Sequence, residues 1–348
     1  MQSKKILILG GLWYLGSHTA LKLIQSNFSV IIVDNFSNSH QKTWEILKKK
    51  GKEQITLYDI DIRDSKLLEE IFEKEEIGIV FHFASKNKQK ESCLEPFIYY
   101  ESNIQGTINL LKIMEKKEIK NLIYSSSSSV YDVDKSIPPF SENDKLNART
   151  PFATTKIIIE QILKDMNIHK HFNIFCLRYF NPIGAIPEEH LWYNPKWIPT
   201  KIVPLLLKTA KGEIENFPIY GDQYPTKDGS CLMDYIHIKD ITDIHLKMVK
   251  YLLNKTEQEN TNENIKSESI YEIMNIGSGI GKTIKEIIEI VELVTNKKIP
   301  YKILDARTGD TAFLLGNNNK LRNFFHREPQ HTIIEAIEDE RKYLNLDS

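Results

Sequence analysis

Short apolar runs recur through the first half of the chain and alternate with stretches of helical spacing. The apolar runs are rich in β-branched residues and predict buried parallel strands over 5–9, 30–33, 55–58, 79–82 and 122–124. The stretches between and after them predict helices over 14–26, 39–50, 64–76, 98–117 and 152–169. Regular alternation of strand and helix predicts the α/β class, with a doubly wound, Rossmann-like parallel sheet.

The composition of the sequence changes after Arg178, and Pro, Gly and Trp recur through residues 182–230. We therefore expect a dinucleotide-binding domain over 1–180. We expect a smaller C-terminal α/β substrate lobe over 181–348, with some of its strands returning to the first domain. A polar stretch over 254–269, rich in Asn, Glu, Lys and Thr, is typical of a mobile surface insertion.

Two later helices carry informative patterns. In the helix from Phe152, the isoleucines over 157–163 form an apolar surface wider than one core-facing stripe. Such a helix either packs on both the sheet and a partner helix or is sunk in its own domain, and the pattern leaves both open. Further on, Ile284, Ile287, Ile288 and Val291 share one face, and Thr283 and Glu286 have the spacing of a capping box.

Composition excludes several classes of protein. The net charge of −1 over 348 residues, with scattered lysines, gives no electrostatic footprint for nucleic acid or an anionic membrane. No apolar run approaches the roughly 20 residues that span a bilayer. The three cysteines are odd in number, far apart and without metal-site spacing. We expect a cytoplasmic protein with no metal.

The first predicted strand ends in a glycine turn, Gly10-Gly11-Leu12-Trp13-Tyr14-Leu15-Gly16, and a helix begins there. Strand, glycine turn and helix are the context of a dinucleotide-binding motif. In that motif the first glycine makes the turn, the second lets the backbone approach the pyrophosphate and the third packs helix on strand. Gly10 and Gly16 occupy the first and third places. Trp13 occupies the second, where an indole fills space meant for phosphate.

Asp34 closes the second predicted strand. In this position a carboxylate accepts hydrogen bonds from a ribose diol, which favours NAD over NADP. Alternatively, Asp34 only caps the next turn. The late segment 277–283 also looks like a phosphate loop, but residue 276 is Ile where that loop needs its first glycine. We interpret 277–283 as a turn that starts a helix.

Several longer strings give the chain a resemblance to a known family. These strings are Asp34-Asn35 with Ser37-Asn38-Ser39, Asp61-Ile62-Arg63, His82-Phe83-Ala84, Tyr124-Ser125-Ser126-Ser127, Leu177-Arg178-Tyr179-Phe180-Asn181-Pro182, Tyr224-Pro225-Thr226-Lys227-Asp228-Gly229, Asp234-Tyr235-Ile236-His237 and Arg307-Thr308-Gly309-Asp310. Together they resemble the UDP-glucose 4-epimerases, which belong to the extended short-chain dehydrogenase/reductase superfamily. The resemblance covers residues 4 to about 315, nearly the whole chain.

The resemblance implies interconversion of UDP-galactose and UDP-glucose in galactose and nucleotide-sugar metabolism. NAD would take and return a hydride at C4 of the sugar through a 4-keto intermediate. Of the family's catalytic residues, Ser127 matches the serine and Lys156 the lysine of the Tyr-x-x-x-Lys pair. Phe152 stands in place of the tyrosine, and phenylalanine has no proton to exchange.

The resemblance also assigns binding positions. The cofactor positions are Gly10, Trp13, Tyr14, Leu15, Gly16, Asp34, Asn35, Asp61, Ile62, Phe83, Asn103, Lys156 and Phe180. The substrate positions are Asn181, Tyr220, Met233, Arg307 and Asp310. Three of the chain's residues depart from the family besides Trp13 and Phe152. Asn87 replaces a lysine near the cofactor phosphates, Met233 an arginine at the UDP pyrophosphate and Lys201 an asparagine near the uridine.

These departures leave three hypotheses for function. The first is a pseudoenzyme that keeps the epimerase fold for a binding or regulatory role. The second is an active epimerase in which Tyr14, Ser127 or a water replaces the missing phenol. The third is a related NAD-dependent reductase or dehydratase, which is disfavoured because those relatives also use the Tyr-x-x-x-Lys pair. As partners we expect a UDP-hexose and either a second copy of this chain or an intact paralogue.

Overall fold

The computed structural model describes residues 4–196, 199–261, 268–307 and 310–343. The chain forms two compact units. The first contains residues up to Val130, Leu146–Arg178 and Thr242–Met274. The second contains Tyr131–Lys145, Tyr179–Ile241 and the residues from Asn275 onward. The expected division at residue 180 stays a prediction.

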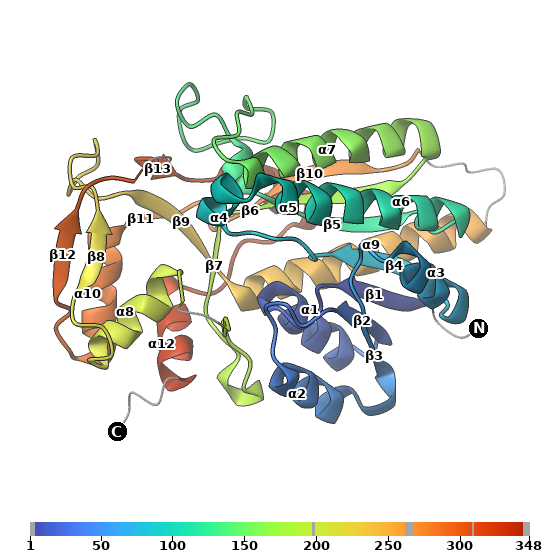
Figure 1. Ribbon diagram of the computed structural model, residues 1–348, viewed down its shortest axis with the longest axis horizontal. Helices are drawn as coiled ribbons and strands as arrows, with labels where there is room; N and C mark the ends of the chain where they lie inside the picture. The colour runs from blue at the N-terminus through green and yellow to red at the C-terminus, as the bar shows by residue number, and fades with distance from the viewer. Residues whose placement is uncertain (1–3, 197–198, 262–267, 308–309, 344–348) are drawn as a thin grey trace. The chain divides into compact units, whose positions relative to one another are not determined.

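A sheet dominates the first unit and has the strand order β10-β6-β5-β4-β1-β2-β3 among the described residues (Figure 1). Its strands are β1 (Lys5–Leu9), β2 (Val30–Asp34), β3 (Ile55–Asp59), β4 (Ile77–His82), β5 (Asn121–Ser127), β6 (Asn173–Tyr179) and β10 (Tyr271–Ile276). The pairs that join β3, β2, β1, β4 and β5 are parallel. The predicted doubly wound, Rossmann-like α/β fold is confirmed.

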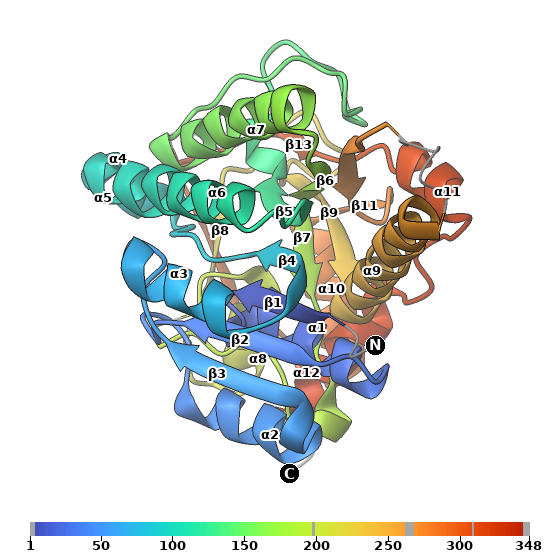
Figure 2. The same ribbon diagram turned by 90° about the vertical axis from the view of Figure 1, so that its right-hand side faces the viewer.

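Helices cover both faces of this sheet, as Figure 2 shows, with α3, α6 and α7 on one face and α1, α2 and α9 on the other. Their bounds are α1 (Tyr14–Gln25), α2 (Gln41–Gly51), α3 (Ser65–Lys74), α4 (Gln89–Leu94), α5 (Pro96–Tyr99), α6 (Gly106–Lys116), α7 (Pro151–Lys170) and α9 (Ile238–Thr261), with short turns η1 (Lys52–Gln54), η2 (Tyr100–Gln105) and η3 (Ser128–Val130). Leu68 of α3, Leu110 of α6 and Leu163 of α7 share one buried core with the strands.

Two expectations for this unit need correction. The helix predicted over 98–117 is interrupted by η2, a π-helical stretch that contains Asn103. Asn103 forms side-chain hydrogen bonds to the backbone of Lys86 and to Thr155, which fix it at this irregular turn. The polar stretch expected as an insertion over 254–269 begins inside helix α9, while its residues 262–267 lie outside the described residues.

The second unit is built on short strands and its own core. Its elements are β7 (Asn181–Ile183), η4 (Pro187–Glu189), α8 (Ile202–Ala210), β8 (Phe217–Tyr220), β9 (Leu232–His237), β11 (Gly281–Thr283), α10 (Ile284–Thr295), β12 (Tyr301–Leu304), β13 (Phe313–Leu314), α11 (Asn319–Phe325) and α12 (Ile333–Tyr343). Strand β9 pairs with β7, β11 and β13, and β8 pairs with β12. Leu206, Ile287 and Ile337 pack helices α8, α10 and α12 into one core.

The predicted capping box at the start of α10 is confirmed. The Thr283 hydroxyl accepts a hydrogen bond from the amide of Glu286 at 3.2 Å, and the Glu286 carboxylate accepts one from the amide of Thr283 at 2.9 Å. Ile287 and Val291 of the predicted apolar face are fully buried. The local sequence was sufficient here because both partners of the box lie within one helical turn.

The structure tests one of the two interpretations of helix α7, and its packing on a partner helix stays a prediction. Ile159 and Leu163 are buried in the sheet core, whereas Ile158 remains 37% exposed and Ile168 is 52% exposed. The helix is therefore not sunk in its own domain, and part of its apolar surface faces outward.

Candidate nucleotide site

The glycine turn after β1 is held by close backbone contacts. Gly10 has φ +75°, and a Cβ there would meet the backbone nitrogen of Ala84 at 2.8 Å. A Cβ at Gly16 would meet the carbonyl oxygen of Gly10 at 2.2 Å. Position 10 therefore needs glycine for its conformation, and position 16 needs it because helix α1 packs directly on the turn.

Trp13, between these glycines, is the N-cap residue of α1. Its backbone is extended, with φ −85° and ψ 172°, and its amide donates to the carbonyl of Gly10 at 3.4 Å. The indole is partly exposed and lines the same pocket as Gly10 and Asp34. The side chain that replaces the middle glycine therefore forms part of the wall of the pocket. The neighbouring Tyr14 is buried, and its ring has an edge contact with His18. Leu15 is partly exposed.

The pocket encloses about 170 Å³ at the carboxyl ends of β1, β2 and β4. It lies within the first unit. Its lining residues are Gly10, Trp13, Val33, Asp34, Asn35, Ser37, Asn38, Ser39, Ile60, Asp61, Ile62, Arg63, Phe83, Ala84, Ser85, Lys86, Asn87 and Ser102. Ligands of doubly wound folds bind at this edge of the sheet, where the loops that follow the strands converge. The structure thus brings seven of the predicted cofactor positions to one pocket from four separate loops, namely Gly10, Trp13, Asp34, Asn35, Asp61, Ile62 and Phe83, whereas Tyr14, Leu15, Gly16, Asn103 and Lys156 do not line it.

Asp34 is buried and accepts hydrogen bonds on both carboxylate oxygens. The amide of Leu12 donates to Oδ2 at 2.9 Å, and the amide of Phe36 and hydroxyl of Ser39 donate to Oδ1 at 3.0 and 2.7 Å. Burial raises the pKa of Asp34, although the three hydrogen bonds act to lower it. The carboxylate therefore caps the following turn and also lines the pocket, so the two interpretations of Asp34 are compatible. Its role toward a ribose stays a prediction.

Asp61 adds a second carboxylate to the pocket wall. Arg63 donates two side-chain hydrogen bonds to it at 2.9 Å each, and Asn35 donates one at 2.8 Å. The hydrogen bonds from Arg63 lower the pKa of Asp61 to about 2, against a smaller opposing effect of burial. Asp61 is therefore an anionic acceptor over the whole physiological pH range.

The loop after β4 carries the substituted position Asn87. Its neighbours Lys86 and Lys88 form ion pairs with Glu91, at 3.8 and 3.4 Å. Lys86 also lines the pocket, so a cationic side chain remains beside the position that lost its lysine. Asn103 lines no part of this pocket, because its side chain is buried against the Lys86 backbone.

Lys156 lies on the first turns of α7 and is buried. Its ammonium group donates to the carbonyl of Ser125 at 2.8 Å and to the hydroxyl of Ser85 at 3.2 Å. It lies 5.7 Å from the ring centroid of Phe152 and 5.0 Å from that of Tyr124. Burial lowers the pKa of Lys156 to about 7. The helix spacing that places a tyrosine beside this lysine thus places the Phe152 ring there.

Sequence reasoning missed Ser85, Ser125 and Tyr124 in this cluster. A serine hydroxyl or carbonyl that positions a lysine leaves no signal in local sequence, because the contacts span 71 and 31 residues. Burial raises the pKa of Tyr124 well above its usual range, and its hydroxyl finds no partner among the described residues. Ser127 accepts hydrogen bonds from the amide and hydroxyl of Ser129 at 3.2 and 2.9 Å.

The predicted substrate positions belong to the second unit. Asn181 donates to the carbonyl of Asp234 at 2.7 Å. Arg307 lies with its guanidinium 4.0 Å from the Tyr220 ring centroid and forms two hydrogen bonds to Asp310, at 2.8 and 3.0 Å. Thr308 and Gly309 of the same string lie outside the described residues.

Other predicted positions in this unit are partly or fully buried in different surroundings. Met233 packs at the edge of the core, and Phe180 lies 6.3 Å from the Tyr131 ring. Lys201 donates to the carbonyl of Pro182 at 2.9 Å, and burial lowers its pKa to about 8.

In the phosphate-loop-like segment 277–283, backbone amides donate hydrogen bonds to a carboxylate of the same chain. The carboxylate of Asp234 accepts hydrogen bonds from the amides of Ser278 at 2.7 Å, Gly279 at 3.1 Å and Gly316 at 3.2 Å. These amides are the groups that a phosphate would need, so the segment has no phosphate site to offer. It leads into α10, as the helix-start interpretation predicted.

Within the described part of the chain, no three His, Cys, Asp or Glu side chains come together as metal ligands would. None of the described helices combines the length and the apolar character needed to cross a membrane.

A parallel sheet, a glycine turn opening helix α1 and a carboxylate at the end of β2 define the class of dinucleotide-binding α/β proteins. The model of the NAD dependent epimerase/dehydratase family matches residues 6–277. The chain belongs to this family.

Within the family the chain is similar to UDP-glucose 4-epimerases. The enzyme of Bacillus subtilis is 33% identical over 96% of this chain and 95% of its own length, and that of Rhizobium meliloti is 33% identical over 97% and 96%. A UDP-glucose 4-epimerase structure from Bifidobacterium longum in complex with NAD+ and UDP has a TM-score of 0.88 at 32% identity, covering 98% of both chains. The Stenotrophomonas maltophila enzyme with bound NAD and formylated UDP-arabinopyranose has a TM-score of 0.89 at 30% identity, covering 98% of this chain and 97% of its own.

Proposed function

We propose that this protein is a UDP-glucose 4-epimerase-like pseudoenzyme, catalytically impaired or inactive, which retains a binding or regulatory role in nucleotide-sugar metabolism. The observation that carries the proposal is Phe152, whose ring lies 5.7 Å from the ammonium group of Lys156. Removal of a hydroxyl proton by a positioned base is typically worth 10²–10⁴-fold in rate, about 3–5 kcal/mol of barrier. A phenyl ring supplies none of this.

The rest of the catalytic pair supports loss of chemistry with retention of shape. Lys156 keeps both hydrogen bonds that position it, but a buried ammonium needs a nearby anion to hold its proton. A tyrosinate at position 152 would be that anion. With Phe152 in its place, the lysine holds its charge only weakly at neutral pH, which is consistent with its lowered pKa.

For NAD, we propose that the two ends of the pocket differ in fit. Asp34, Asn35, Asp61, Ile62 and Phe83 offer acceptors and apolar walls suited to an adenosine, and these side chains would hold it. At the pyrophosphate end, the motif needs a glycine so that the backbone can approach the phosphates closely, and this chain has Trp13 there. NAD, when bound, accepts and returns a hydride at the sugar carbon.

A UDP-hexose remains the proposed substrate-side ligand. Asn181 and the Arg307–Asp310 pair are retained, and the Arg307 guanidinium over the Tyr220 ring forms a flat, charged surface. Met233 brings no positive charge to a pyrophosphate. We therefore expect UDP-sugar to bind more weakly than in an intact epimerase, without turnover.

The alternative function is active interconversion of UDP-galactose and UDP-glucose through a 4-keto intermediate. The observation that favours it is the retained placement of Lys156 by Ser85 and Ser125. A substitute base would then be Ser127, Tyr14 or a water. Tyr14 is buried against His18, and Ser127 accepts two hydrogen bonds from Ser129. Tyr124 is no substitute, because burial raises its pKa well above the usual range.

The deciding experiment is conversion of UDP-galactose to UDP-glucose by the wild type with added NAD. We expect no turnover above background, and sustained turnover by the wild type would overturn the proposal. The single variant Phe152→Tyr should stay inactive if Trp13 obstructs the cofactor. The double variant Trp13→Gly with Phe152→Tyr should gain about 10²–10⁴-fold over either single change. Phe152→Leu is the matched control, since it keeps the position apolar.

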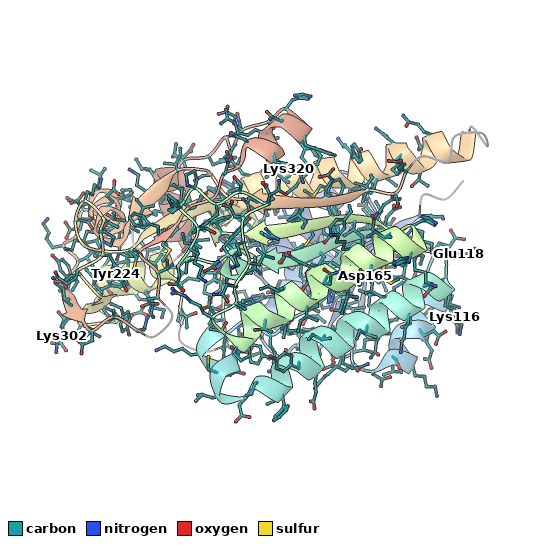
Figure 3. All side chains as sticks on the ribbon, turned by 90° about the horizontal axis from the view of Figure 1, so that it is seen from above. Lys116, Glu118, Asp165, Tyr224, Lys302 and Lys320 are labelled. Atoms are coloured by element: carbon teal, nitrogen blue, oxygen red, sulfur yellow. The ribbon has the colours of Figure 1, made fainter. Side chains whose placement is uncertain are left out.

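We also propose a cytoplasmic dimer, with a second copy or an intact paralogue. Leu94 and Phe97 are each 79% exposed, and they lie on α4 and α5, which contact α7 with its outward Ile158. Figure 3 shows α7, marked by Asp165, running alongside α6, marked by Lys116. Together, Leu94, Phe97 and Ile158 give this helical face an apolar character that a partner would cover. Size-exclusion chromatography with light scattering should report a dimer, and Phe97→Lys should give a monomer.

A further inference from the structure

We propose that the pocket of the first unit binds an adenosine mononucleotide, such as AMP, in preference to NAD. The inference deepens the proposed binding role by naming the class of ligand. It stands on the contrast between the two ends of the pocket, one with the expected residues and one lined by an indole in place of the middle glycine.

The preserved end has the groups that recognise an adenosine. Asp61 is a permanently ionised acceptor in the pocket wall, suited to the exocyclic amino group of adenine. Ile60 and Ile62 supply apolar surface for the base. Asp34 closes β2, where a carboxylate accepts from the hydroxyls of a ribose.

The altered end lies at the start of α1. Gly10 brings the backbone close to the loop after β4, so the floor of the pocket there is main chain. A glycine at position 13 would leave a backbone cradle open to the second phosphate of a dinucleotide. Trp13 takes the place of that glycine, and its side chain is part of the pocket wall. A ligand that ends at its first phosphate does not need the cradle.

The charge of the pocket agrees with a ligand that carries one phosphate. Lys86 in the wall and the N-terminal end of α1 favour one negatively charged group. Glu91 shares the charge of Lys86 at 3.8 Å, which favours a single phosphate over a pyrophosphate.

Isothermal titration of the full chain with AMP, adenosine, NAD and UMP tests the proposal. AMP should bind at least about tenfold more tightly than NAD, and UMP should bind more weakly than AMP. Trp13→Gly should raise the affinity for NAD at least about tenfold and change that for AMP by less than about threefold. Glycine is tolerated at an N-cap, so this variant is expected to fold. Trp13→Ala should shift NAD affinity in the same direction and serves as the second variant.

Two further variants locate the effect. Trp44→Ala, on α2 outside the pocket lining, is the matched control and should leave both affinities unchanged. Asp34→Ala should weaken AMP at least about tenfold, since it removes the ribose acceptor.

Wild-type protein that binds NAD as tightly as AMP, that retains stoichiometric NAD through purification, or that binds neither nucleotide would overturn the preference. Those outcomes leave the loss of the catalytic base untouched, because that proposal depends on turnover of UDP-galactose. Turnover of UDP-galactose by the wild type would contradict the pseudoenzyme proposal and leave the nucleotide preference to the titrations.

Discussion

Lys156 in the first unit is buried and Lys201 in the second is half-buried, and the two lysines have similar immediate surroundings. Lys156 donates to the carbonyl of Ser125 at 2.8 Å, and Lys201 to that of Pro182 at 2.9 Å. Each ammonium also lies about equally far from an aromatic ring, at 5.0 and 4.9 Å. Burial lowers their pKa values to about 7 and about 8.

The two lysines differ in the carboxylate that each one faces. Near Lys156, Glu160 is already bound by Arg178 at 2.7 Å, so little of its charge is left for the lysine. Near Lys201, burial raises the pKa of Glu340 to about 7, and Lys201 opposes that rise. The comparison teaches that a nearby carboxylate helps a buried lysine to keep its proton, and does so less when another cation already pairs with that carboxylate.

The largest effect is expected from breaking the ion pair that takes Glu160 away from Lys156. Arg178→Met leaves a buried carboxylate without its cation and should lower the free energy of unfolding by about 3–5 kcal/mol. Urea denaturation followed by circular dichroism measures the loss. The double variant Glu160→Gln with Arg178→Met should recover a large part of it, because no buried charge is then left unpaired. A single variant within about 1 kcal/mol of wild type would show that Lys156 takes over Glu160.

An intermediate, pH-dependent effect is expected from Lys156→Met. The pKa of Lys156 is lowered on folding from 10.5 to about 7, so the unfolded chain binds more protons between these values. The cost that burying the charged ammonium group imposes on the free energy of unfolding is thus fully present below pH 7. It disappears as the pH rises toward 10.5. Lys156→Met should therefore stabilise the protein at pH 6, on the order of 2 kcal/mol. The gain should shrink by pH 9.

Lys201→Met is the partner measurement, made by urea denaturation at the same pH values. Its gain at pH 6 should be smaller than that of Lys156→Met, because the pKa of Lys201 falls only to about 8. Equal gains at both sites at pH 6 would contradict the smaller pKa shift of Lys201.

The smallest effect concerns a helix start away from both lysines. Thr283→Ala removes the side-chain acceptor of the α10 capping box and should cost about 1 kcal/mol of stability. Thr283→Ser retains the acceptor and should stay close to wild type. A loss as large as that of Arg178→Met would mean that the hydrogen bond from Thr283 to Asp228 matters more than the cap.

Much of the fold followed from local pattern. Strands β1 to β5 of the first sheet and the helices α1, α3 and α7 lie where period and β-branched runs predicted them, whereas β6 and β10 were not predicted. These elements bury continuous apolar sequence, so their signal is local. The interruption of the helix around Asn103 was not predictable, because the side chain is fixed by Lys86 and Thr155 from distant segments.

The candidate site was predicted in its residue types more than in its contacts. Local sequence places Phe152 and Lys156 one helical turn apart, and the missing phenol follows directly from residue identity. The serines that position Lys156, and the Glu91 carboxylate that pairs Lys86 and Lys88, come from other loops. Their partnerships appear only after the strands are paired.

The sequence by itself determined the alternating α/β architecture, the capping box of α10 and the absence of an ionisable side chain at position 152. These depend on residue identity and on spacings of one or two helical turns. The tertiary structure alone decided that Asp234 occupies the amides of the second glycine-rich turn, and that Trp13 forms a wall of the pocket shared with Asp34. It also set the pKa values of Lys156 and Lys201, because burial and charge are properties of the folded surroundings.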